Sequence, residues 1–155
     1  MHRQAPSDPT NAQLTLIADS FRRLTQRALV ATDSALRQAL WHADAAILAH
    51  GTENDPIFFY GNRRALELFE MSFEDFTQLP SRFSAEPLER EARAQLLARV
   101  SRDGYIDDYA GVRISASGRR FMIHGAVVWN LIDEQGALHG QAATFSRWSL
   151  LDQGS

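Results

Sequence analysis

Three polar residues, Arg113, Asn130 and Gln141, stand where the sequence could support binding chemistry. Each lies in a run of apolar residues that alternates with the period of a β-strand. A polar group inside a sheet must find a hydrogen-bond partner, either within the protein or in a ligand. Arg113 is the candidate for a charged contact and Gln141 for the edge of a planar ring. A partner within the protein is an equally open reading for all three.

A second cluster places an imidazole and two carboxylates, His50, Glu53 and Asp55, within six residues. These groups could hold a divalent cation or serve as general acids and bases. The intervening Gly51 and the following Pro56 are typical of a turn. We therefore favour turn chemistry here and predict neither a metal site nor a catalytic residue.

The residue types that are missing narrow the possible reactions. The 155 residues include no cysteine, and all sixteen basic residues are arginine. Disulfides, thiolate metal sites, cysteine nucleophiles and cysteinyl flavin adducts are thereby excluded. Chemistry that needs a lysine amine, such as a Schiff base or a phosphate-loop lysine, is excluded too.

Charge and hydropathy patterning bear on partners and location. The formal net charge of -3 argues against a nucleic-acid partner. No apolar run approaches the roughly 18 residues of a membrane span, so we expect no membrane partner and a cytoplasmic location.

The elements that must position these residues follow from hydrophobic periodicity. We expect a disordered leader over residues 1–12, helices over 13–43, a core over 44–149 and a tail over 150–155, all in one domain. The core begins with a hairpin and continues through short helices. It ends in three antiparallel strands, of which the central one is apolar on both faces. Alternation assigns Phe121, Ile123, Val127 and Trp129 to one face, and Met122, Ala126, Val128 and Ile132 to the other. Helices should therefore cover both sides of the sheet.

This order of elements is that of the PAS fold, and the chain resembles the MEKHLA family, a PAS-like module, over about residues 14–148. The residues that carry the resemblance are Asp19-Ser20-Phe21-Arg22-Arg23-Leu24-Thr25, His50-Gly51-Thr52-Glu53, Asp55-Pro56-Ile57-Phe58, Asn62 to Phe69, Leu79-Pro80-Ser81-Arg82, Ser84-Ala85-Glu86-Pro87, Gly104-Tyr105, Gly111-Val112-Arg113-Ile114, Val128-Trp129-Asn130 and Gly140-Gln141-Ala142-Ala143. Family members include stand-alone bacterial proteins, as we expect here, and the carboxyl-terminal part of plant homeodomain–leucine zipper transcription factors.

The resemblance implies an α+β fold, a five-stranded antiparallel sheet with short helices on one face and an N-terminal helical cap. It also implies a pocket between the concave face of the sheet and the short helices. The residues that we place in that pocket as ligand or cofactor contacts are Asn62, Phe69, Phe83, Tyr109, Arg113, Trp129, Asn130, Gln141 and Phe145. Ordinary core packing is the alternative for each aromatic residue.

The sequence does not identify a cofactor. Non-covalent flavin beside Gln141 remains open. Haem ligation in PAS sensors commonly uses a histidine on the long helix before the last three strands, and residues 87–102 contain none. His124 could ligate haem, although a lone strand histidine is more often hydrogen-bonded or at the surface.

The function implied is a small sensory or ligand-binding module that signals through dimer or partner contacts. One alternative is an enzyme that uses His50, Glu53 or Tyr109 as acid–base groups in the same pocket. Another is a dimerisation scaffold without a ligand. A homodimer could form through an apolar stripe on the first helix, made of Leu14, Ile17, Phe21 and Leu24, or the stripe could instead cover the sheet.

Overall fold

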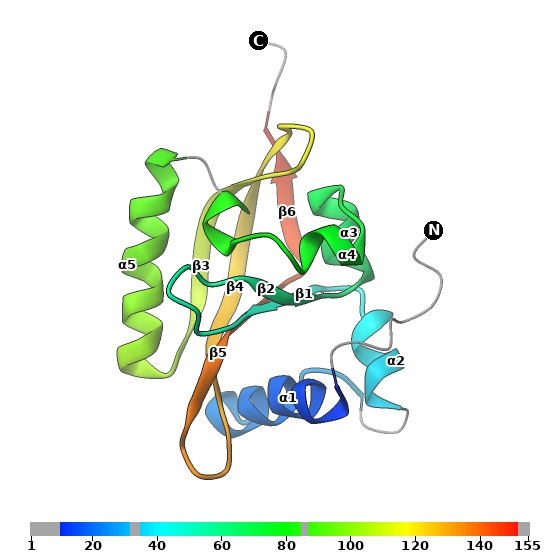
Figure 1. Ribbon diagram of the computed structural model, residues 1–155, viewed down its shortest axis with the longest axis vertical. Helices are drawn as coiled ribbons and strands as arrows, with labels where there is room; N and C mark the ends of the chain where they lie inside the picture. Colours follow the sequence, from blue (N-terminus) through cyan, green and yellow to red (C-terminus); the bar gives the residue numbers. More distant parts are fainter. Residues whose placement is uncertain (1–9, 32–34, 85–86, 152–155) are drawn as a thin grey trace.

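The computed structural model describes residues 10–31, 35–84 and 87–151. Their helices and strands follow one another in the predicted order (Figure 1). The helices are α1 (Asn11–Thr25), α2 (Leu36–Trp41), α3 (Arg63–Phe69), α4 (Phe73–Phe76), the 3-10 turn η1 (Ser81–Ser84) and α5 (Pro87–Asp103). The strands are β1 (Ala46–His50), β2 (Phe58–Gly61), β3 (Tyr105–Ile114), β4 (Arg120–Ile132), β5 (Leu138–Phe145) and β6 (Arg147–Leu150).

All the strands join one antiparallel sheet in the order β2-β1-β5-β4-β3. β1 enters the sheet beside the last long strand, pairing Ala46 with Phe145 and His50 with Gln141. The hairpin and the carboxyl-terminal strands therefore form a single surface, as the PAS-like prediction requires. β6 lies beyond the end of β5 and pairs with the first half of β4. The last of the three strands predicted at the end of the core is thus divided at Ser146.

The face assignment predicted for β4 is wrong beyond its midpoint. Gly125 has a φ of 60°, and the pairing of β3 with β4 shifts register on either side of Tyr109. This irregularity reverses the alternation, as a β-bulge does. Ile123, Ala126 and Val128 consequently share the concave face, while Trp129 points to the opposite side.

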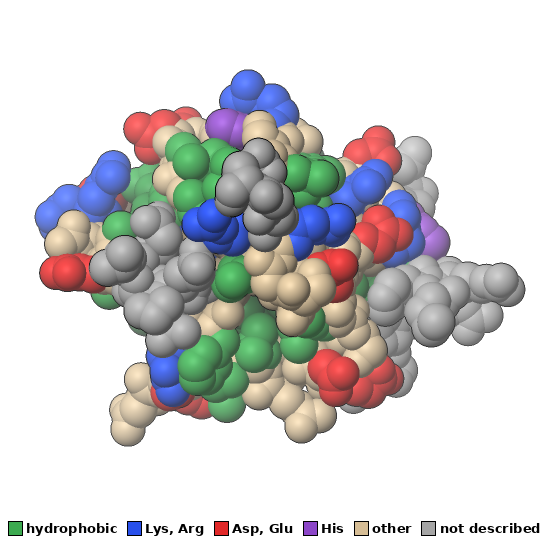
Figure 2. All heavy atoms as spheres, turned by 90° about the horizontal axis from the view of Figure 1, so that it is seen from above, with side chains coloured by type: hydrophobic (Ala, Val, Ile, Leu, Met, Phe, Trp, Pro, Cys, Tyr) green, Lys and Arg blue, Asp and Glu red, His purple; other side chains and the backbone are tan. Residues whose placement is uncertain are grey.

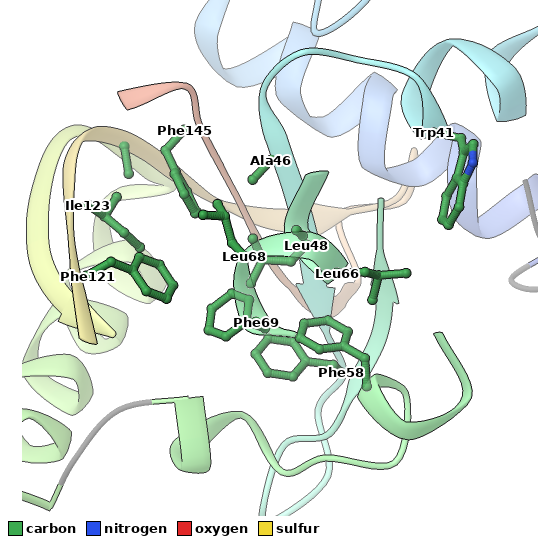
Figure 3. Close-up of a cluster of buried hydrophobic side chains, with 13 residues drawn as sticks. Trp41, Ala46, Leu48, Phe58, Leu66, Leu68, Phe69, Phe121, Ile123 and Phe145 are labelled. Atoms are coloured by element: carbon green, nitrogen blue, oxygen red, sulfur yellow. The ribbon is translucent and has the colours of Figure 1, made fainter. Parts of the chain in front are cut away.

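The concave face packs against the short helices. Phe121 and Ile123 of β4 point toward Phe69 of α3, whose ring centroid lies 5.3 Å from that of Phe121 (Figure 3). Phe58 of β2 stacks on Phe76 of α4 with 4.3 Å between centroids. These aromatic contacts fix α3 and α4 over one end of the sheet.

The convex face is covered by α1. Leu14, Ile17 and Phe21 are buried against the sheet, and Phe21 meets the indole of Trp129 edge-on at 4.9 Å. Three of the four residues of the predicted stripe are thus buried within one chain, and Leu24 is half-buried. Of the two readings of the stripe, the structure supports the one in which it covers the sheet.

Side-chain caps set the starts of several helices. Thr10 and Gln13 form a capping box, so α1 begins at Asn11, two residues before the predicted start. Ser72 accepts from the backbone N–H of Asp75 at the start of α4.

The outer surface carries both signs of charge. In the end-on view of Figure 2, basic, acidic and hydrophobic side chains are interspersed on the visible face, with no continuous basic area. Among the helices of the described residues, none has the length and apolar character needed to cross a bilayer.

Candidate ligand-binding cavity

A cavity of about 50 Å³ lies between the concave face of the sheet and the helices α3, η1 and α5. Strands β1 to β5 all contribute residues to its wall. The residues that line it are Leu48, Ala49, His50, Phe58, Phe69, Ser84, Leu96, Leu97, Tyr109, Arg113, Ile123, Ala126, Val128, Gln141, Ala142, Ala143 and Phe145.

Five of the nine predicted pocket residues meet at this cavity, namely Phe69, Tyr109, Arg113, Gln141 and Phe145. They come from α3, β3 and β5, and their side chains converge because these elements surround one end of the concave face. The sequence-based prediction therefore locates the cavity, although it does not define its whole wall.

Arg113 and Tyr109 form the polar part of the β3 wall. Arg113 is 7% exposed, and its guanidinium carbon lies 5.2 Å from the centre of the Tyr109 ring. One guanidinium nitrogen, Nη1, donates to the carbonyl oxygen of Val112 at 2.8 Å. Gly111 makes this arrangement possible, since a Cβ at this position would lie 2.1 Å from the Tyr109 hydroxyl.

Gln141 connects the opposite wall to α5. Its amide nitrogen donates to the Leu97 carbonyl at 3.2 Å, the Ser101 hydroxyl at 3.3 Å and Asn130 Oδ1 at 3.0 Å. Asn130 in turn donates to the Val100 carbonyl at 2.9 Å. Both buried amides therefore have partners within the protein. Asn130 supports the wall from behind Gln141 and does not itself line the cavity.

Three predicted pocket residues lie elsewhere. Asn62 is fully buried at the start of α3, where its amide bonds to the backbone of Ala65, Ile47, Leu40 and Ala45. Phe83 is 42% exposed and is covered by Arg82, whose guanidinium carbon lies 4.1 Å from the ring centre. Trp129 faces α1, where its indole N–H donates to the Ile17 carbonyl at 3.3 Å.

Apart from His50, which the enzyme alternative places in the pocket, the remaining wall residues are ones that the sequence did not single out for it. Ala126 and Val128 share a face with each other but reach the cavity only because of the irregularity at Gly125. Leu96 and Leu97 come from α5, whose position over the sheet is a tertiary feature. A glycine inside a strand pattern is a recognised signal of a bulge, so Gly125 was the available clue.

The cluster around the first turn does not gather into one site. His50 Nδ1 lies 3.0 Å from the Gly51 carbonyl, and Glu53 accepts from the Ile57 N–H at 3.2 Å. Asp55 is bound by Arg82 at 3.0 Å. Glu53 thus stabilises the turn, and Asp55 forms an ion pair with Arg82. Within the described ranges, no three histidine, aspartate or glutamate side chains are placed to share a metal ion.

The profile of the MEKHLA domain matches residues 11–150 of the sequence. The chain belongs to the MEKHLA family. A curated relative of this family member is the homeobox-leucine zipper protein HOX10 of Oryza sativa subsp. indica, 29% identical over 117 residues. The match covers 75% of this chain but 14% of the relative, so the MEKHLA chain spans about a seventh of that protein.

Solved structures with the same fold include PAS and photoreceptor domains. The PAS domain of a protein from Colwellia psychrerythraea has a TM-score of 0.59 at 16% identity, over 69% of this chain and 88% of that domain. The light-state dimer of the fungal blue-light photoreceptor Vivid has a TM-score of 0.62 at 15% identity. The match covers 92% of this chain and 98% of the Vivid chain. At these identities the likeness establishes the PAS-like fold of the MEKHLA chain.

The cavity can be tested against the cofactors that such folds carry. Pockets for drug-sized ligands measure about 300–1,000 Å³, whereas this cavity measures about 50 Å³. The amide nitrogen of Gln141 is already bound to three oxygen atoms of the protein. His124 does not line the cavity, and its Nε2 lies 2.9 Å from the Ser149 hydroxyl. The cavity in this structure therefore fits neither a flavin ring nor haem.

Proposed function

We propose that this MEKHLA-family protein is a sensory module that binds a small molecule in the cavity and signals through dimer or partner contacts. The observation that carries the proposal is that neighbouring residues of the sheet face the cavity on one side and α1 on the other. The amides of Gln141 and Asn130 are on the concave face, and the adjacent Trp129 holds α1 on the convex face. One strand thus touches both the proposed ligand site and the helical cap.

Hydrogen bonds supply the connection from site to surface. Trp129 donates to Ile17 in the middle of α1, and Ser20 exchanges two hydrogen bonds with the backbone of Ile132 at 2.9 and 3.0 Å. A ligand that moves the cavity-lining Val128 of β4 or Gln141 of β5 would shift these strands, and α1 would follow because these bonds fix it to β4. The ligand shifts the equilibrium only if it binds the two arrangements with different affinity.

The test combines binding with a readout at α1. Purified protein is titrated with propionate, propionamide and 1-propanol, and binding is followed by NMR signals of Gln141 and Tyr109. Amide hydrogen exchange of residues 11–25 is then compared with and without the compound that binds. We expect a change in exchange of at least threefold in α1. Binding without any change in α1 would contradict the proposed signalling route.

The small volume of the cavity supports a second candidate, a dimerisation scaffold without a ligand. An Ala143→Val substitution, which adds two methyl groups to the cavity wall, separates the two. If the protein is a scaffold, filling the cavity leaves its association unchanged and no small molecule binds the wild type.

The dimer and its location are further parts of the proposal. Because Leu14, Ile17 and Phe21 are buried within the chain, a dimer through α1 would use the residues left at its surface, such as the half-buried Leu16 and Leu24. Light scattering gives the oligomeric state of the wild type and of Leu16→Glu. A dimer that the substitution leaves intact would place the interface elsewhere. We place the protein in the cytoplasm, which cell fractionation tests.

A further inference from the structure

The guanidinium of Arg113 is a buried cation for which the described part of the chain provides no anion. Arg113 is 7% exposed, and its hydrogen bonding within the described residues is limited to the Val112 carbonyl. No carboxylate of those residues pairs with it. A buried charge without a partner is unfavourable. An anionic group that enters with a ligand would remove that cost.

The shape of the arginine selects among anions. Tyr109 covers one face of the guanidinium, at 5.2 Å between the guanidinium carbon and the ring centre. The edge of the guanidinium, with its N–H groups in one plane, is left for the ligand. Two parallel N–H groups match the two oxygen atoms of a carboxylate, which is the geometry in which arginine binds most specifically.

Two other polar side chains of the wall have hydrogen-bond partners in the protein. Gln141 donates to Leu97, Ser101 and Asn130, and the Ser84 hydroxyl donates to the Ser81 carbonyl at 2.7 Å. Within the described residues Arg113, by contrast, makes one hydrogen bond, to the Val112 carbonyl, and its guanidinium keeps further N–H donors for a ligand. Much of the remaining wall is apolar, including Leu48, Ile123, Val128 and Phe145.

Size limits the ligand as well. A cavity of about 50 Å³ holds roughly three to five water-sized groups. We propose that the cavity binds a short aliphatic monocarboxylate, with its carboxylate on Arg113 and its hydrocarbon chain against Ile123 and Val128. This inference rests on the proposed function and specifies its ligand class. A second carboxylate on the ligand would lie against apolar side chains, so dicarboxylates should bind less well.

Calorimetric titration of the full chain tests the ligand class. Propionate is compared with propionamide, which replaces the carboxylate by a neutral amide of similar shape, and with succinate and nitrate. We expect propionate to bind at least tenfold more tightly than propionamide or succinate, and more tightly than nitrate because its ethyl group contacts the apolar wall. Arg113→Gln should weaken propionate at least tenfold, whereas Arg147→Gln, an exposed arginine on β6, should bind as the wild type does.

A melting measurement on Arg113→Gln and one further variant, Gly111→Ala, keep the result independent of folding. Arg113→Gln removes a buried charge and should raise the melting temperature of the ligand-free protein. Gly111→Ala keeps the charge but displaces the Tyr109 ring, because the added Cβ would lie 2.1 Å from the hydroxyl, and it should weaken propionate several-fold.

The outcomes separate the inference from the function on which it rests. If propionate and propionamide bind equally well and Arg113→Gln changes neither affinity, the cavity binds small molecules but does not recognise a carboxylate. That result would overturn the inference and leave the proposed function standing. Nitrate binding as tight as propionate would replace it with an inorganic anion. If none of the compounds binds, including 1-propanol, the proposed function fails together with the inference.

Discussion

Buried polar side chains in this fold differ in whether the protein satisfies them. Asn130 and Gln141 are tied to α5 and to each other, so their amides cost little to bury. Arg113 and Tyr60 are the contrasting cases. The hydroxyl of Tyr60 is buried and has no hydrogen-bond partner in the described residues. Sequence patterning places all four residues in strands, but it cannot tell which will find a partner, because the partners come from other elements.

Tyr60→Phe should be neutral or stabilising at pH 7, by up to about 1 kcal/mol, because it removes a hydroxyl that pays for desolvation without a hydrogen bond. Burial raises the pKa of Tyr60 above its ordinary value, and the opposing effect of the nearby Arg37 charge is smaller. The neutral phenol is therefore favoured in the folded state. Stability from this group is complete below the unfolded pKa of about 10 and falls as the pH rises beyond it.

Urea unfolding of wild type and Tyr60→Phe between pH 7 and 11 measures both effects. The difference in stability should widen in favour of the variant above about pH 10. A constant difference across this range would show that Tyr60 is not the group responsible.

At the scale of elements, single residues fix where helices and strands meet. Hydrophobic periodicity predicts most of the strands and helices, because these elements depend on the spacing of apolar residues along the chain. It placed Ile123 and Trp129 on one face of β4 and Ala126 and Val128 on the other. In the structure Ile123, Ala126 and Val128 share a face, because the irregularity at Gly125 reverses the faces of β4 midway. The break at Ser146 likewise depends on strand pairing, since one half of β4 pairs with β5 and the other half with β6.

Asn62 joins three elements and should be costly to remove. Its side chain accepts from Ala65 at the start of α3 and from Ile47 in β1, and it donates to the Leu40 carbonyl in α2 and to Ala45. Asn62→Ala should destabilise the fold by about 3 kcal/mol, because it leaves several buried groups unpaired. Ser72→Ala, which removes a cap from α4 alone, should cost about 1 kcal/mol. Chemical unfolding that gives equal losses would contradict this role.

Gly140 is the point of closest approach between β5 and β1. Its φ is 145°, and a Cβ here would lie 2.0 Å from the backbone oxygen of His50. Neither backbone can move without breaking the sheet, so Gly140→Ala should cost about 3 kcal/mol or more. Gly136→Ala is the matched control, because Gly136 also has a positive φ, of 84°, but has nothing within 4 Å. Its cost should stay near the backbone strain of about 1–2 kcal/mol and so below the loss at Gly140.

The whole molecule is a sheet with a small cavity on one face and α1 on the other. The sequence predicted these layers through the order of its elements and the resemblance to a PAS-like family, and the family profile over residues 11–150 confirms the family. Cavity size was beyond the sequence, because it depends on how α5 and α3 sit on the sheet. The response of the whole molecule to a ligand therefore depends on how strongly α1 is coupled to β4.

Ser20→Ala should loosen that coupling without unfolding the protein. Ser20 lies on the buried face of α1, and its hydroxyl accepts from the Ile132 N–H and donates to the Ile132 carbonyl. Losing both bonds leaves the apolar contacts of Leu14, Ile17 and Phe21, so we expect a loss of about 1–3 kcal/mol. Amide exchange in α1 should accelerate more than exchange in β1 or β5, since the helix opens first.

Thr25→Ala serves as the control, because the Thr25 hydroxyl donates to the Phe21 carbonyl within α1 and does not reach the sheet. It should leave the exchange of α1 close to that of the wild type except at the last turn. If Ser20→Ala instead accelerates exchange equally in α1 and the central strands, then the cap and the sheet open as one unit. A ligand signal carried from β4 to α1 would in that case need global opening, which a sensory module that responds while folded cannot use.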